Sequence, residues 1–188
     1  CNQMGALLIL DEIQPGFGRT GKLFAFEHYD CVPDVLVMGK GMASGLPVGA
    51  FSASNKMMQT LQHSPKLGHI TTFGGNPLIA AASLATLKEI TEGGHIPATL
   101  EKEKLLRKLL KHPLIEEIRG KGLMLALILK DKEMADRVIL DSAKKGLILF
   151  WLLFEPRAVR ISPPLTITNE EIEKGCRLII DTLDDISQ

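Results

Sequence analysis

Two short, wholly apolar segments constrain the fold most, because each ends directly at a loop that carries a charged residue. Residues 6–10 (ALLIL) run into Asp11, and residues 35–38 (VLVM) run into a glycine-flanked lysine, Lys40. Apolar runs of this length, bounded by turn residues, are typical of strands buried on both faces of a parallel sheet. With a third run over residues 48–52, they predict an α/β fold with a parallel sheet.

The pattern changes at Asn76-Pro77, where a long helix is predicted, with the proline in its first turn. Glycines and a proline over residues 93–97 then mark a boundary. The remainder of the chain is predicted to be a smaller α+β unit, with helices over residues 100–110, 133–145 and 170–186 and strands over residues 122–129, 147–154 and 159–161. We therefore expect two domains, residues 1–96 and residues 97–188.

Composition excludes several classes of protein. The 188 residues carry 22 Lys+Arg and 22 Asp+Glu, so no basic field favours nucleic acid. A hydrophobic content of 45% excludes disorder, and no apolar run reaches the roughly 20 residues of a membrane span. Three scattered cysteines, Cys1, Cys31 and Cys176, fit a reducing, cytoplasmic setting without disulfides. No nucleic-acid or membrane partner is expected.

The start of the chain is unusual for a complete protein. It opens on Cys1 rather than methionine, and a strand that needs neighbours on both sides comes almost at once. We therefore expect the sequence to begin inside a longer protein.

Lys40 and Asp11 are the first candidates for chemistry. In an open parallel sheet, ligands bind beyond the carboxyl ends of the strands, where both residues are predicted to lie. A desolvated lysine there suits Schiff-base chemistry, and a carboxylate can keep a pyridinium nitrogen protonated. Each residue also has a simpler interpretation, as a solvated loop lysine and as a capping or loop carboxylate. The pair alone leaves these alternatives open.

The motifs around this pair are more specific. In order along the chain they are DEIQ (11–14), GFGRTGK (16–22), PD (33–34), GK (39–40), TTFGGNP (71–77) and RISPPL (160–165). Together they resemble the carboxyl-terminal half of a class III pyridoxal-phosphate-dependent aminotransferase, of the ornithine, acetylornithine or 4-aminobutyrate type. The resemblance implies the PLP-dependent transferase fold type I (aspartate aminotransferase-like), with part of the large parallel-sheet domain over residues 1–96 and the small α+β C-terminal domain over residues 97–188.

The resemblance also implies a role for each matched residue. Lys40 matches the lysine that forms the Schiff base with pyridoxal 5'-phosphate and then moves the substrate proton. Asp11 matches the partner of the pyridine nitrogen, and Gln14 the side chain near the phenolic oxygen. Thr72 matches the hydroxyl that reaches the phosphate of the neighbouring subunit's cofactor, which implies a homodimer with a shared active site. Arg160 matches the guanidinium that takes a substrate carboxylate, for which its planar fork is suited.

Several of these residues have competing interpretations. Gln14 could instead hydrogen-bond loop backbone. Thr71 competes with Thr72, and its position favours a structural role. Arg157 competes with Arg160, but only Arg160 directly precedes the ISPPL segment.

Other charged and polar residues have structural interpretations. We expect Arg19 and Lys22, in the glycine-rich loop, to form loop-fixing salt bridges or to be solvated. The five histidines show no ligand spacing, so no metal site is expected, and His28 and His69 are interpreted as loop residues.

The implied reaction moves an amino group from a small-molecule amine donor to a keto-acid acceptor. The donor is expected to be an ω-amino acid such as ornithine, acetylornithine or 4-aminobutyrate, and the acceptor a keto acid such as 2-oxoglutarate. Two alternatives stay open. The chain could be a catalytically inert fragment of such an enzyme, or it could belong to a related class III isomerase or decarboxylase.

Overall fold

The computed structural model describes residues 1–187, apart from the side chain of Asn2. The chain divides into two compact units that are not two simple halves. The first contains Cys1–Gly18 and Lys22–Gly94, and the second contains Arg19–Gly21 together with the chain from His95 onward. Three residues of the glycine-rich loop therefore belong with the second unit.

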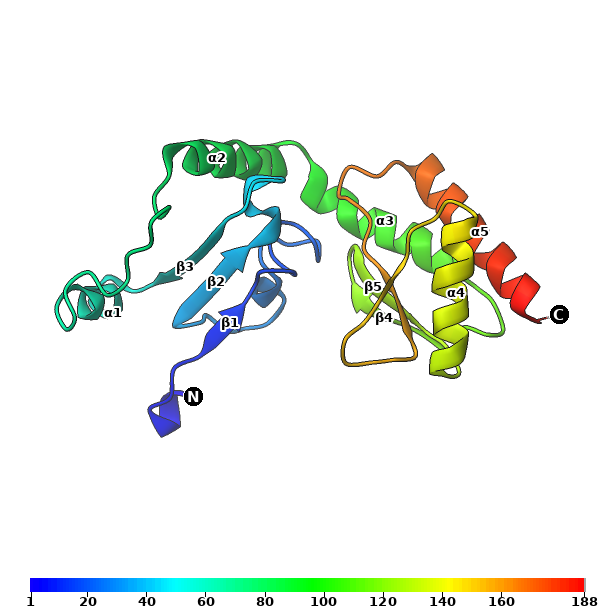
Figure 1. Ribbon diagram of the computed structural model, residues 1–188, viewed down its shortest axis with the longest axis horizontal. Coiled ribbons are helices and arrows are strands. Elements are labelled where there is room, and N and C mark those ends of the chain that lie inside the picture. Colours follow the sequence, from blue (N-terminus) through cyan, green and yellow to red (C-terminus); the bar gives the residue numbers. More distant parts are fainter. Residues whose placement is uncertain (188) are drawn as a thin grey trace. The chain divides into compact units, whose positions relative to one another are not determined.

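A three-stranded sheet forms the centre of the first unit, in the order β1 (Ile9–Asp11), β2 (Val35–Gly39) and β3 (Gly49–Ala53). β1 and β2 are parallel, as predicted, and Figure 1 shows their arrows pointing the same way. β3 runs antiparallel to β2, so the prediction of a wholly parallel sheet is wrong. The reason is length, since residues 40–48 are too few for a crossover helix.

The remaining elements of this unit are helical. They are η1 (Asn2–Met4), η2 (Ala25–His28), η3 (Lys40–Ala43), α1 (Asn55–Gln59), η4 (Thr60–Gln62) and α2 (Pro77–Glu92). The long helix predicted at Asn76-Pro77 is confirmed as α2. The Asn76 side chain accepts hydrogen bonds from the backbone N–H groups of Leu78 and Ile79, at 3.0 and 3.4 Å, and Pro77 occupies the first turn.

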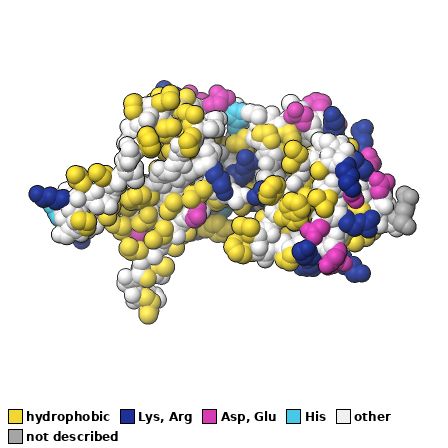
Figure 2. Space-filling view, viewed as in Figure 1, with side chains coloured by type: hydrophobic (Ala, Val, Ile, Leu, Met, Phe, Trp, Pro, Cys, Tyr) yellow, Lys and Arg dark blue, Asp and Glu magenta, His cyan; other side chains and the backbone are white. Residues whose placement is uncertain are grey.

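The strands of the first unit are more exposed than the sequence predicts. Ile9 of β1 and Phe51 of β3 are 58% and 49% exposed, and Leu78 of α2 is 67% exposed. Figure 2 shows hydrophobic side chains at the surface over these elements. The expectation of strands buried on both faces is therefore wrong for the described residues, because no element among them covers these side chains.

The second unit has a four-stranded antiparallel sheet in the order β4 (Glu117–Lys121), β5 (Met124–Ile128), β7 (Ala158–Ile161) and β6 (Phe150–Trp151). Three helices pack with it: α3 (His95–Leu109), α4 (Lys132–Lys144) and α5 (Asn169–Ser187). The predicted helices and the β6–β7 strand pair are confirmed. β4 is missed by the sequence pattern because its residues, EIRGK, are mostly polar.

Alternation along the strands gives the second sheet two different faces. Leu127 and Val159 belong to the main hydrophobic core, which also takes in side chains of α3, α4 and α5. Ala126 and Ala158 belong to a small separate cluster on the opposite face. Arg160 is paired with Ala126 across β5 and β7, so it lies on the face that the main core does not occupy.

Within residues 1–187, no helix combines the length and the apolar character that a membrane span requires.

Candidate active site

Asp11 and Lys40 lie at the same edge of the first sheet. Asp11 is the last residue of β1 and is paired with Val37 of β2, and the next residue, Glu12, donates its backbone N–H to the Val37 carbonyl at 2.8 Å. Lys40 follows the last residue of β2 directly. Because β1 and β2 are parallel, their carboxyl ends meet at one edge (Figure 1), which is where α/β sheets bind ligands.

Lys40 has an uncommon backbone conformation. Its φ is +45°, in the left-handed region that few residues other than glycine adopt. Its neighbour Gly39 is buried, and a Cβ there would lie 3.2 Å from the carbonyl oxygen of Val48. The Lys40 side chain is exposed and has no hydrogen bond or ion pair with any described residue. Its amine is therefore free for chemistry at the sheet edge.

Some polar side-chain atoms at the same sheet edge as Lys40 have no hydrogen-bond partner among the described residues. Asp11 Oδ1 accepts the backbone N–H of Ile13 at 2.9 Å, whereas Oδ2 has no partner among residues 1–187. The half-buried Gln14 side chain has no hydrogen bond within the same residues, so the alternative in which it bonds loop backbone is not seen. An amine, a carboxylate oxygen and an amide at one sheet edge are the groups that a pyridoxal ring requires, so the residues present fit this cofactor.

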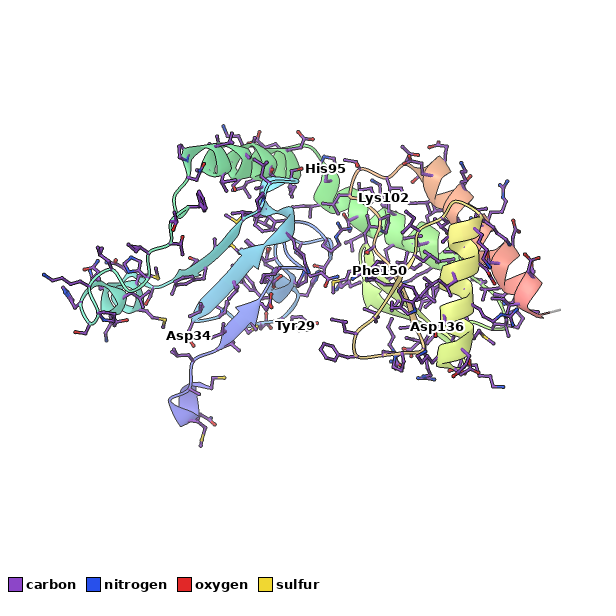
Figure 3. All side chains as sticks on the ribbon, in the orientation of Figure 1. Tyr29, Asp34, His95, Lys102, Asp136 and Phe150 are labelled. Atoms are coloured by element: carbon purple, nitrogen blue, oxygen red, sulfur yellow. The ribbon has the colours of Figure 1, made fainter. Side chains whose placement is uncertain are left out.

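Two acidic residues, to which sequence reasoning gave no role, fix the two ends of these strands: Glu12 at the carboxyl ends, beside the candidate site, and Asp34 at the amino ends. Glu12 is only 3% exposed, and its carboxylate accepts the backbone N–H groups of Ala25 and Phe26, at 2.9 and 2.8 Å. Asp34, labelled in Figure 3, accepts the Leu8 N–H at 2.7 Å. The DE and PD motifs contain both residues, so the signal was present in the sequence.

Glu12→Ala is expected to destabilise the first unit by about 1–3 kcal/mol, because two buried N–H groups lose their acceptor. The measurement is the urea unfolding midpoint. Glu92→Ala, at the exposed end of α2, is the matched control. Equal midpoints for the two variants would contradict a structural role for Glu12.

The structure distinguishes the two threonines before α2. Thr71 closes a turn, with its carbonyl accepting the Gly74 N–H at 3.2 Å, and its Oγ1 lies 2.8 Å from where a Cβ on Gly74 would stand. Thr72 is exposed, and its hydroxyl has no described partner. No hydrogen bond joins Thr72 to Lys40 or Asp11 in the described residues. Thr71 therefore has the local structural contact, and Thr72 is available for contacts outside this chain.

Arg160 and Arg157 also have different surroundings. Arg157 forms ion pairs with Glu155 and Glu116, at 3.3 and 3.2 Å. Arg160 has no carboxylate partner in residues 1–187. Its Nε is buried without a hydrogen bond, and its guanidinium carbon lies 4.8 Å from the centre of the Phe150 ring. Unused donors on a stacked guanidinium suit an incoming carboxylate.

A cavity of about 290 Å³ lies beside Arg160. Its lining is mostly apolar and includes Leu147, Ile161 and Pro163, together with Cys176. Burial raises the pKa of the Cys176 thiol to about 11, so this thiol stays protonated and unreactive near neutral pH.

Arg19 does not have the role expected from the sequence. Its guanidinium donates to the carbonyl oxygens of Pro163 and, at 3.4 Å, of Leu123, and no carboxylate in residues 1–187 pairs with it. Burial lowers the pKa of Arg19 from its ordinary value. The expectation of a salt bridge or a solvated charge is therefore wrong for Arg19, whose partners are carbonyls, whereas Lys22 is exposed as expected.

Comparison with protein families gives a match over residues 1–183 to the model of the class III aminotransferases. The chain belongs to this family. Class III aminotransferases depend on pyridoxal phosphate, so the family and the cofactor predicted from the motifs are confirmed.

Two curated aminotransferases illustrate the similarity. The acetylornithine aminotransferase of Caldanaerobacter subterraneus subsp. tengcongensis is 39% identical over 191 residues, an alignment that covers 99% of this chain and 47% of that protein. The putrescine aminotransferase of Pectobacterium atrosepticum is 40% identical over 190 residues, covering 97% of this chain and 40% of that protein. The chain thus spans less than half the length of these relatives.

Solved aminotransferase structures confirm the predicted fold. A Bacillus anthracis aminotransferase matches with a TM-score of 0.90 and 32% identity, over 98% of this chain and 46% of that one. An ornithine aminotransferase from Toxoplasma gondii, whose active site is partially occupied by PLP, matches with a TM-score of 0.88 and 32% identity, over 100% of this chain and 45% of that one. The chain therefore has part of the PLP-dependent aminotransferase fold.

Proposed function

We propose that this chain supplies the lysine, the ring-nitrogen partner and the substrate arginine of a transaminase. The donor is an ω-amino acid such as ornithine, acetylornithine or 4-aminobutyrate, and the acceptor is a keto acid such as 2-oxoglutarate. The main support is the position of Asp11 and Lys40 at the same edge of two parallel strands. Asp11 Oδ2 and Lys40 Nζ both lack a hydrogen-bond partner among residues 1–187. The relatives named above act on acetylornithine, putrescine and ornithine.

In this mechanism each residue acts at one atom. Bound pyridoxal phosphate supplies an aldehyde for covalent attachment and a ring that accepts electrons. Lys40 Nζ would be the attachment point and, once the donor amine has displaced it, would move the proton to and from the substrate carbon that bears the amino group. The Asp11 carboxylate holds a proton on the ring nitrogen. The Gln14 amide donates a hydrogen bond to the phenolic oxygen.

The substrate and the second subunit involve the remaining two residues. Arg160 takes the substrate carboxylate, which its unused donors support. Thr72 contacts the phosphate in a neighbouring subunit, so the active enzyme is a homodimer. The exposed and unpartnered hydroxyl of Thr72 is consistent with such a contact. A cytoplasmic location stays a prediction from the cysteine usage.

Cofactor attachment tests the proposal directly. The protein is incubated with pyridoxal phosphate, its visible spectrum is recorded, and borohydride followed by peptide mass analysis locates the modified lysine. We expect a yellow protein with the label on Lys40. A colourless pyridoxamine form is first converted by adding a keto acid. A protein that takes up no cofactor after this step would support the inert fragment instead.

The products separate the transaminase from a class III isomerase or decarboxylase. A transaminase consumes the amine donor only in proportion to the keto acid that is converted. Product formation without a keto acid would favour the isomerase or decarboxylase.

A further inference from the structure

Three residues of the glycine-rich loop, Arg19, Thr20 and Gly21, are built into the second unit. The Arg19 carbonyl accepts the Leu123 N–H at 2.9 Å, and the Arg19 side chain donates in return to the Leu123 carbonyl. The packing leaves no space for side chains at the adjacent glycines. A Cβ on Gly122 would lie 2.5 Å from the Arg19 carbonyl oxygen, and one on Gly21 would lie 2.5 Å from Leu100. The backbone of Arg19 is therefore fixed at the turn between β4 and β5.

From this fixed position the Arg19 guanidinium also donates to the carbonyl of Pro163. The segment it holds begins directly after β7 and contains two consecutive prolines, Pro163 and Pro164. Proline has no backbone N–H, so such a segment has few hydrogen bonds of its own to fix it. A second cation holds its far side, because Lys102 of α3 (Figure 3) donates to the Leu165 carbonyl at 2.5 Å.

Placing the Arg19 charge here costs desolvation free energy, which suggests that the charge has a function. It is partly buried, and its carbonyl partners do not neutralise it as a carboxylate would. A single nitrogen of the Arg19 guanidinium, Nη1, donates to both the Leu123 and the Pro163 carbonyls. Its contacts tie the β4–β5 turn to the segment after β7.

This segment matters because of Arg160, which lies three residues before Pro163, near the end of β7. No described carboxylate orients the Arg160 guanidinium, which packs against the Phe150 ring. The direction of the Arg160 side chain therefore depends on the path of its own backbone, which the held Pro163 fixes on one side.

We propose that Arg19 is a positioning residue for Arg160. By holding the Pro163 carbonyl, Arg19 keeps the end of β7 in the conformation from which Arg160 binds a substrate carboxylate. The inference rests on the proposed role of Arg160 in substrate binding. It assigns Arg19 to recognition of the carboxylate, and not to attachment of the cofactor at Lys40.

The test compares two substrates that differ by one carboxylate in the holoenzyme. The pyridoxamine form is mixed with succinic semialdehyde or with butyraldehyde, and the return of the pyridoxal absorbance gives the rate and the apparent Kd. Arg19→Gln is expected to raise the apparent Kd for succinic semialdehyde about tenfold, as the loss of a charged hydrogen bond predicts. The Kd for butyraldehyde is expected to stay within about twofold. Arg19→Lys is expected to give an intermediate increase, because the ammonium keeps the charge and N–H donors for these carbonyls but on a side chain of different shape and reach.

Arg157→Gln is the matched control, since it removes an arginine from the same unit without touching the segment 162–165. It is expected to leave both Kd values unchanged. Equal increases for the two aldehydes in Arg19→Gln, or no increase for either, would overturn the proposal. If Arg19→Gln does not fold, the same comparison in Arg19→Lys decides between these outcomes. Failure of the proposed function is distinguishable, because the pyridoxamine form of the unmodified enzyme would then convert neither aldehyde nor 2-oxoglutarate.

Discussion

Lys40→Ala is expected to abolish borohydride labelling and to lower the rate of amino transfer by a factor on the order of 10³ or more, because the covalent attachment point and the proton carrier are lost together. The fold should be retained, since the exposed Lys40 side chain has no partner within residues 1–187. The measurement is the single-turnover rate with an amine donor, together with peptide mass analysis after borohydride.

Lys56→Ala is the control for this prediction, because Lys56 is an exposed lysine of the same unit on helix α1. It should retain both the label and the rate. A Lys40→Ala protein that is still labelled, or that transfers amino groups at the original rate, would place the chemistry on another lysine.

Asp11→Asn is expected to retain cofactor attachment and to lower the rate of amino transfer by a factor on the order of 10²–10³, the range found for the loss of one electrostatic stabiliser. The variant is nearly isosteric, and its amide oxygen can still accept the Ile13 N–H that Asp11 Oδ1 accepts at 2.9 Å. What it loses is the negative charge that holds a proton on the ring nitrogen. The single-turnover rate reports this loss, and the visible spectrum reports whether the cofactor is still attached.

The control for the charge is Asp30→Asn, which removes an exposed carboxylate from the same unit. It should leave the rate unchanged. A rate for Asp11→Asn within about threefold of the original would mean that Asp11 is only a turn-capping carboxylate, the simpler interpretation left open by the sequence.

The elements with strong local signals could be predicted from the sequence. Asn76 before Pro77 predicts the start of α2, and its side chain accepts the expected capping hydrogen bonds from the first turn of the helix. Residues 6–10 and 35–38 predict neighbouring parallel strands, which places Asp11 and Lys40 at one edge. The family motifs carry this information because the same residues are required for the chemistry and for the turns that follow each strand.

Other features depend on distant parts of the chain and carry no local signal. The direction of β3 follows from the length of the preceding segment, which the pattern of apolar residues does not report. The strand β4 is too polar to be recognised without its partner β5. The role of Arg19 depends on Pro163, 144 residues further along the chain, so a salt bridge was the natural but wrong expectation.

Because Arg19–Gly21 belong to the second unit, the protein cannot be divided into its two units by a single cut in the chain. The chain crosses from one unit to the other after Gly18, after Gly21 and after Gly94. A polypeptide that begins at His95 would lack Arg19, so the Leu123 N–H would lose its acceptor and Pro163 its donor. A recombinant second unit that begins at His95 would therefore be incomplete, and adding back a peptide with the sequence GRTG (residues 18–21) would be the simplest way to complete it.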